Sequence, residues 1–99
     1  MLLNDIKLSL RISHNALDND IDDLIQAARQ DLKLSGISST KVDDSTTNID
    51  PLIKRAIVTY VKANYASDIK EAERFQISYD LLKNHLSLAG DYTDGDVIA

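Results

Sequence analysis

The sequence predicts an all-α fold: a small bundle of three long helices plus a short N-terminal helix, with a long loop between the second and third helices. Apolar residues recur at alternating steps of three and four, which is the spacing of one helix face. Glycine and proline are scarce, three and one in 99 residues, and Gly36, Pro51 and Gly90 stand where predicted helices begin or end. No alternating strand pattern of useful length is present, so we expect no sheet.

The first part of the chain contains a short and a long predicted helix. The short helix runs from about Asn4, its candidate cap, to Leu10, and its inner side holds Leu3, Ile6 and Leu10. The long helix runs from Asp18, as cap, to about Ser35, and its buried face is expected to hold Ile21, Leu24, Ile25, Ala28 and Leu32. Four aspartates, at positions 18, 20, 22 and 23, crowd its first turns, where the helix dipole stabilises acidic side chains. Gly36 can take the left-handed conformation that closes such a helix.

The segment from Ser38 to Ile49 is polar and β-branched, and it lacks a helical period. About a dozen irregular residues is long for a connection between helices, which commonly takes roughly two to eight. We therefore expect this loop either to be slack or to contact a partner. Its candidate contact residues are Lys41, Val42, Asp43 and Asp44.

The second half contains two long predicted helices. The first begins after an Asp50 cap, with Pro51 at the first helical position, and runs to about Tyr65. Its apolar residues are Leu52, Ile53, Ala56, Ile57, Tyr60 and Val61. The second runs from about Ile69 to Leu88, with Ser67 or Asp68 as its cap and Gly90 after its end, and its buried stripe holds Ala72, Phe75, Tyr79, Leu82 and Leu86.

The length allows one domain, which we place at residues 1–90, followed by an acidic tail at residues 91–99 that we expect to be mobile. The net charge is −5, and three of these negative charges lie in the tail, which has three aspartates and no basic residue. Tyr92, the one aromatic residue of this polar segment, is a further candidate contact.

Charge and composition exclude several classes of protein. An excess of carboxylates argues against tight binding to nucleic acid, because Lys and Arg supply most of that affinity. The chain has no cysteine, so neither a disulfide framework nor a thiolate zinc site is available. The first residues lack the pattern of a signal peptide, and no apolar stretch approaches the roughly 20 residues that cross a bilayer. We therefore expect that the chain is made in the cytoplasm and does not associate with a membrane.

No residue pattern predicts a metal, a cofactor or catalysis. The aspartate spacing near position 20 imitates the start of a calcium loop, but Asp23 stands where such a loop needs glycine and Arg29 where it needs glutamate. The two histidines, His14 and His85, show no ligand spacing with a carboxylate or thiolate. No serine lies in a glycine-rich nucleophile turn, and no phosphate-binding loop is present. We expect no enzyme activity.

The last two predicted helices carry a basic bias, at Lys54, Arg55, Lys62, Lys70, Arg74 and Lys83. These side chains either form a solvated face with acidic neighbours or bind an acidic surface. Such a surface is available on the Asp18–Ser35 helix and the tail of another copy, so that a head-to-tail contact builds a ring. Arg55, Arg74 and Lys83 are the candidate interface residues of this group.

The chain resembles the small head-tail connector, or adaptor, proteins of tailed bacteriophages and prophages. The likeness lies in residues 3–12 with 18–28, in residues 50–57, and in residues 72–76 with Tyr79, Leu82 and Leu86. Together these segments span most of residues 3–90. The loop at 38–49 and the residues after Gly90 match weakly.

The resemblance implies a non-enzymatic virion protein at the head-tail junction. It implies a ring of copies below the portal protein, joined to the tail or a stopper protein, through which DNA passes without specific binding. A net-acidic opening would repel phosphates and leave DNA free to move. We expect the loop to reach a neighbouring copy and the tail to dock on the portal or the next ring protein. The alternative is a small phage DNA-binding regulator or packaging subunit that reads DNA through Lys54, Arg55 and Lys62, although Tyr60 and Val61 on that helix look buried.

Overall fold

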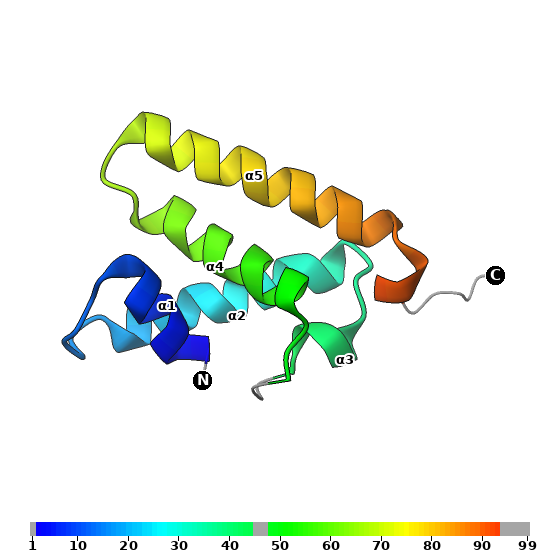
Figure 1. Cartoon of the computed structure of the whole chain (residues 1–99), viewed down its shortest axis with the longest axis horizontal. Coiled ribbons are helices and arrows are strands. Elements are labelled where there is room, and N and C mark those ends of the chain that lie inside the picture. The colour runs from blue at the N-terminus through cyan, green and yellow to red at the C-terminus, as the bar shows by residue number, and fades with distance from the viewer. Residues whose placement is uncertain (1, 45–47, 94–99) are drawn as a thin grey trace.

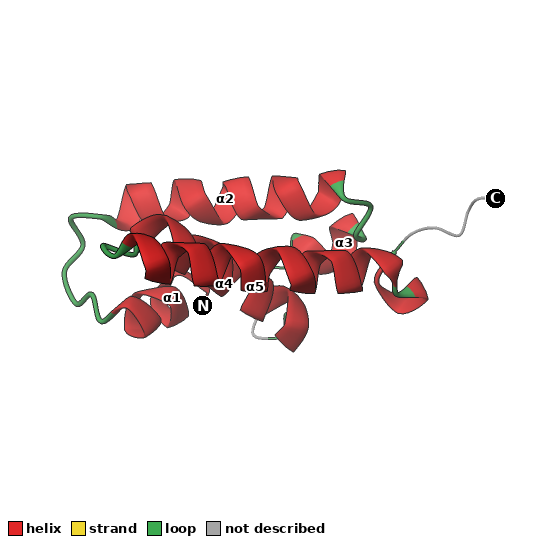
Figure 2. Cartoon of the chain, turned by 90° about the horizontal axis from the view of Figure 1, so that it is seen from above, coloured by secondary structure: helices red, strands yellow, loops and turns green. Residues whose placement is uncertain are grey.

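In a computed structural model, which describes residues 2–44 and 48–93, the described residues form five α-helices and one 3-10 helix. They are α1 (Leu2–Leu10), α2 (Asp18–Leu34), α3 (Ser39–Val42), α4 (Pro51–Tyr65), α5 (Ile69–Leu88) and η1 (Gly90–Tyr92). Figure 1 shows α4 between α5 and α2, and Figure 2 shows α1 and α2 on opposite sides of α5 in the view from above. The all-α prediction is confirmed.

Helix α4 is central because it contacts α1, α2 and α5. Four of its side chains are fully buried, Ile53, Ala56, Ile57 and Val61. Its start is fixed by the Asp50 carboxylate, which accepts hydrogen bonds from the backbone N–H groups of Leu52 at 2.8 Å and Ile53 at 3.3 Å. Pro51 follows as the first helical residue, so the cap and both ends of this helix agree with the sequence prediction.

Helix α2 buries the apolar face that its sequence predicts. Ile21, Ile25, Ala28 and Leu32 are buried, and Leu24 lies half-buried against the same core. Its start differs from the prediction, because the N-cap position is Leu17 and no side chain caps it. Asp18 is instead the first helical residue, and its carboxylate pairs with the Lys7 ammonium at 2.8 Å.

The end of α2 is a Schellman motif built on Gly36. This glycine has a φ of +95°, its N–H donates to the Lys33 carbonyl at 3.0 Å, and the Ile37 N–H donates to the Leu32 carbonyl at 3.2 Å. Leu32 and Ile37 are both buried, as the apolar contact of this motif requires. The predicted left-handed Gly36 is confirmed.

Helix α5 packs on α4 through the stripe that the sequence predicts. Tyr79 and Leu86 are buried, while Ala72, Phe75 and Leu82 are half-buried. The Tyr79 ring meets the Tyr60 ring of α4 edge to face, with centroids 5.1 Å apart. Asp68 caps the helix by accepting a hydrogen bond from the Lys70 N–H at 3.1 Å, so the choice between Ser67 and Asp68 falls on Asp68.

Three local expectations are wrong. Asn4 does not cap α1, because the helix already begins at Leu2. Gly90 does not close α5 with a left-handed conformation, since α5 ends at an extended Ala89 and Gly90 begins η1. The segment expected to be irregular contains α3, because the fully buried Val42 anchors a short turn of helix to the core. Residues 45–47 of that segment lie outside the described residues.

The Gly36→Ala variant tests the Schellman motif. A Cβ at this position meets no atom within 4 Å, so the cost comes from the positive φ alone. We expect the free energy of unfolding to fall by about 1–2 kcal/mol. Urea unfolding followed by far-UV circular dichroism measures it.

Gly90→Ala is the matched control, since its Cβ also meets no atom within 4 Å but its φ is not in the left-handed region. Its effect should stay within about 0.5 kcal/mol. Equal losses in the two variants would contradict the assignment.

Candidate subunit interface

The interface residues predicted from the sequence lie in separate parts of the fold. The four candidates from the loop lie in α3 or directly after it: Lys41, Val42, Asp43 and Asp44. Tyr92 lies beside Lys41. Arg55 lies on α4, and Arg74 and Lys83 lie on α5. They therefore do not form one patch.

Tyr92 is tied to the body of the protein. Its hydroxyl lies 3.1 and 2.9 Å from the two carboxylate oxygens of Asp50, to which it donates, and its carbonyl accepts from the Ser38 N–H at 2.7 Å. The Lys41 ammonium lies 5.4 Å from its ring centroid, and Thr93 pairs with Ile37 in an antiparallel bridge. The hydrogen bond to Asp50 raises the pKa of the Tyr92 hydroxyl.

These contacts place residues 91–93 against α3 and the start of α4, although the sequence assigned them to a mobile tail. Residues 94–99, the rest of that tail, lie outside the described residues. The Asp50 carboxylate thus has two roles, since it caps α4 and holds η1.

The loop residues face the core and α2 as well as the solvent. Val42 is fully buried, so its side chain belongs to the core and we leave it out of the surface proposed below. Asp43 pairs with Lys33 at 3.0 Å, and the Asp44 carbonyl lies 3.5 Å from the Arg29 guanidinium. These contacts dock the loop on the last turns of α2.

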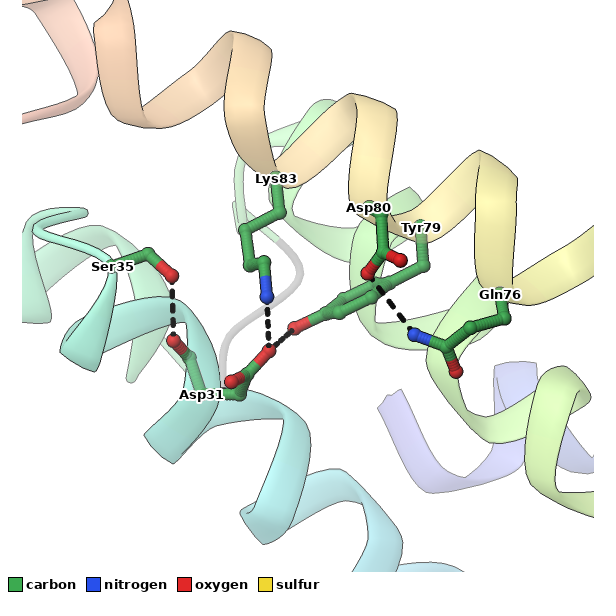
Figure 3. Close-up of polar contacts among 6 residues, drawn as sticks. All are labelled: Asp31, Ser35, Gln76, Tyr79, Asp80 and Lys83. Atoms are coloured by element: carbon green, nitrogen blue, oxygen red, sulfur yellow. Dashed lines mark hydrogen bonds and ion pairs between the residues drawn. The ribbon is translucent and has the colours of Figure 1, made fainter.

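Lys83 takes part in a polar cluster that joins α2 to α5. One oxygen of the Asp31 carboxylate accepts a hydrogen bond from the Tyr79 hydroxyl at 2.6 Å and another from the Lys83 ammonium at 3.0 Å (Figure 3). Partial burial acts to raise the pKa of Asp31, but the two hydrogen bonds outweigh it and hold this pKa below its usual value. Burial and the Asp31 carboxylate raise the pKa of Tyr79. Lys83 therefore serves a contact within the chain.

Helix α5 has a second face that nothing in the described part of the chain covers. Its residues are all exposed and recur at alternating steps of four and three: Lys70, Arg74, Ile77, Leu81, Asn84 and Leu88. We call this set the outer stripe of α5. Ile77, Leu81 and Leu88 are 59, 65 and 86 % exposed, which is high for large apolar side chains in one row. The sequence analysis did not identify this stripe, because the inner stripe of α5 has the same period. The pattern that could have revealed it is the second apolar series, Ile77, Leu81 and Leu88, which lies half a turn around the helix from the inner stripe.

A basic groove borders this stripe between α4 and α5. It encloses about 750 Å³ and is lined by Lys54, Arg55 and Lys62 and by apolar side chains that include Val58, Phe75 and Leu81. Lys54 pairs with Asp5 at 2.7 Å, and the Lys62 ammonium lies 5.7 Å from the Phe75 ring centroid. Arg55 and Arg74 are exposed, and neither makes an ion pair with another described residue. Of the predicted basic face, Lys54 and Lys62 thus have contacts within the chain, whereas Arg55 and Arg74 remain available to a partner.

Other kinds of site receive no support from the described residues. No group of three or more His, Cys, Asp or Glu side chains among them is placed to hold a metal ion. None of the helices in residues 2–44 and 48–93 combines the length and apolar character needed to cross a bilayer. The exposed apolar stripe and its basic border are the candidate surface for association that the described residues offer.

A double-mutant cycle tests the two roles of Asp50. Tyr92→Phe should lower the free energy of unfolding by about 1–2 kcal/mol, because it removes a hydrogen bond to a carboxylate. Asp50→Ala should cost about 2 kcal/mol or more, since it also removes the cap. In the Asp50→Ala background, Tyr92→Phe should have almost no effect in urea unfolding.

Asp68→Ala is the matched control for this cycle, because Asp68 also caps a helix but no tyrosine is bonded to it. We expect Asp68→Ala to lower the free energy of unfolding by about 1 kcal/mol. Its effect and that of Tyr92→Phe should add in the double variant. Additive losses at Asp50 and Tyr92 would show that the hydroxyl bond contributes nothing.

The Asp31 cluster predicts a dependence of stability on pH. Because the folded state lowers the pKa of Asp31 below 3.8, its stabilisation is complete above that value and is lost as pH falls through the folded pKa. The difference in urea midpoint between the native chain and Asp31→Asn should therefore be constant at neutral pH and shrink in acid. Glu73→Gln, at an exposed position beyond the first turn of α5, should leave the midpoint unchanged. A difference at Asp31 that persists undiminished in strong acid would argue against the cluster.

The comparisons with known proteins give one family match. A family model described as a phage connector protein matches residues 2–93. No curated protein matches the chain, and no solved structure does either. The family is a structural one, and membership implies contacts with other components of the phage particle. With nearly the whole chain matched, the protein belongs to the phage connector protein family.

Proposed function

We propose that this chain assembles with copies of itself into a ring between the portal protein and the tail or its stopper, at the head-tail junction of the virion. The observation that carries the proposal is the uncovered outer stripe of α5 in a chain whose connector-family match extends over residues 2–93. DNA passes through the opening of the ring without being bound specifically.

The size of the chain supports an assembly. A domain of 99 residues removes only about 60–65 % of its unfolded surface from water, so its own core is thin. Several large apolar side chains remain exposed on the described residues: Leu8, Leu34, Leu52, Ile69, Ile77, Leu81 and Leu88. Covering the ones that lie in a row on α5 adds buried apolar area that the monomer lacks.

The charge supports passage of DNA rather than capture. The net charge is −5, and Asp20, Asp22 and Asp23 are exposed at the start of α2. A subunit of this charge repeated around an opening repels phosphates, most strongly at low salt. The DNA-binding alternative is weaker because two of its three basic side chains have contacts within the chain: Lys54 is paired with Asp5 and Lys62 lies on the Phe75 ring, which leaves Arg55 alone open.

Contacts with the other ring proteins are proposed for the ends of the subunit. Lys41 lies beside η1, and Asp43 and Asp44 follow it at the end of α3, where they contact the last turns of α2. We place the portal, tail or stopper contact at this end, with residues 94–99 docking on one of those proteins. Arg55 and Arg74 remain candidates for contacts between copies.

Light scattering of the purified chain, alone and with a portal ring, tests the proposal. We expect either rings of the chain or capture on the portal, both visible by negative-stain electron microscopy. A folded chain that stays monomeric and ignores the portal, or one that binds DNA with a steep salt dependence, would refute it.

The Ile77→Glu/Leu81→Glu variant tests the role of the outer stripe of α5. Both positions are exposed, so the variant should fold, but it should lose rings or portal capture because charges replace the apolar contact. Leu8→Glu is the matched control, since Leu8 is 76 % exposed on α1, away from the stripe, and it should assemble normally.

A further inference from the structure

Helix α2 carries an exposed stripe that matches the outer stripe of α5. Its residues recur at alternating steps of three and four and all are exposed: Asp20, Asp23, Ala27, Gln30 and Leu34. We call this set the outer stripe of α2. Its N-terminal part is acidic, and its C-terminal end is Leu34, which is 76 % exposed.

The two stripes have the same order of charge and apolar character along the chain. On α5 the basic Lys70 and Arg74 come first and the apolar Ile77, Leu81 and Leu88 follow. On α2 the acidic residues come first and the apolar end follows. A parallel pairing of the two helices therefore sets acid against base and apolar side chain against apolar side chain, whereas an antiparallel pairing sets charges against leucines.

The charges on both stripes are available for such a pairing. Asp20, Asp23, Lys70 and Arg74 are exposed, and their side chains make no ion pair with the other described residues. By contrast, Asp18, which lies on the same side of α2 as the buried Ile21 and Ile25, is already paired with Lys7. The free charges are thus those that point away from the core.

The α2 stripe also offers a place for a bulky side chain. Ala27, Gln30 and Leu34 form one wall of an open groove of about 560 Å³, whose other walls include Tyr60, Asn64 and Gln76. The small Ala27 leaves room above it. In a parallel register that sets Asp23 beside Arg74, Ala27 lies opposite Ile77 or Leu81.

The directions of the helices fit a contact between equivalent copies. Figure 1 shows that α2 and α5 both run the same way along the long axis of the molecule. A second copy in a similar orientation presents its α2 parallel to the α5 of the first. Because α2 and α5 are different surfaces, each copy uses both, and successive contacts generate a ring when the rotation between copies closes.

We infer that the outer stripe of α5 in one copy packs in parallel on the outer stripe of α2 in the next copy. This inference rests on the proposed function, of which it names the contact between copies. The partner surface is a second copy of this chain.

Charge-reversal variants test the pairing. In Lys70→Glu/Arg74→Glu both stripes are acidic, and in Asp20→Lys/Asp23→Lys both are basic. Each variant alone should assemble at least about tenfold more weakly than the native chain, because like charges meet at every contact. An equimolar mixture should recover assembly, since each helix then finds a partner of opposite charge.

The matched controls change charge on the same helices outside the stripes. Glu73→Lys on α5 and Asp22→Lys on α2 are exposed changes that should leave assembly within about twofold of the native chain. Circular dichroism confirms that all variants are folded. Assembly is read by light scattering at low and high salt, with the portal ring present in a parallel series.

Cysteine cross-linking fixes the register, because the native chain contains no cysteine. A mixture of Ala27→Cys and Ile77→Cys chains should form a disulfide-linked heterodimer under mild oxidation. A mixture of Ala27→Cys and Glu73→Cys chains should form far less.

The outcomes separate this inference from the proposed function. If the native chain assembles but the mixture of charge variants does not recover and the Ala27–Ile77 cross-link does not form, the inference is wrong and the ring proposal stands. If the native chain assembles neither alone nor with the portal, the proposed function fails, and the inference fails with it.

Discussion

The burial of α4 is the constraint on which the rest of the structure depends. A chain of 99 residues has apolar side chains for one core, and α4 supplies its centre by contacting α1, α2 and α5 at once. Because α5 packs mainly on this one helix, half of its circumference remains outside the core. The thin core and the uncovered face of α5 therefore both follow from the short length of the chain.

The open face is not simply a solvated one. A solvated helix face is normally polar throughout, but this one has large apolar residues at helical spacing next to free basic side chains. The acidic charge on the start of α2 also has two physical readings. It stabilises the helix start through the dipole, and it provides the sign opposite to the base on α5. The two roles are compatible, since the first acts within a subunit and the second belongs to the proposed contact between copies.

The sequence predicts those features of the fold that depend on local chemistry. The Asp50 cap, Pro51 at the first turn and the left-handed Gly36 mark helix ends through contacts between near neighbours, and they were found. The Asp31 cluster and the anchoring of Tyr92 on Asp50 join residues more than 40 positions apart, so no local pattern reveals them. The inner stripe of α5 was predicted from the sequence, but only the tertiary structure shows that no other described element covers the outer stripe. Phage connector membership was indicated by the order of the helices and agrees with the family match.

The two contacts of Asp50 link η1, near the C-terminal end of the described chain, to the central helix α4. The same carboxylate binds the first turn of α4 and the hydroxyl of Tyr92, directly before the residues that continue beyond Thr93. A pull on that end of the chain is transmitted to the N-terminus of α4 rather than absorbed by a loose end. Such a fastening couples a mechanical load at that end of the chain directly to the central helix of the core.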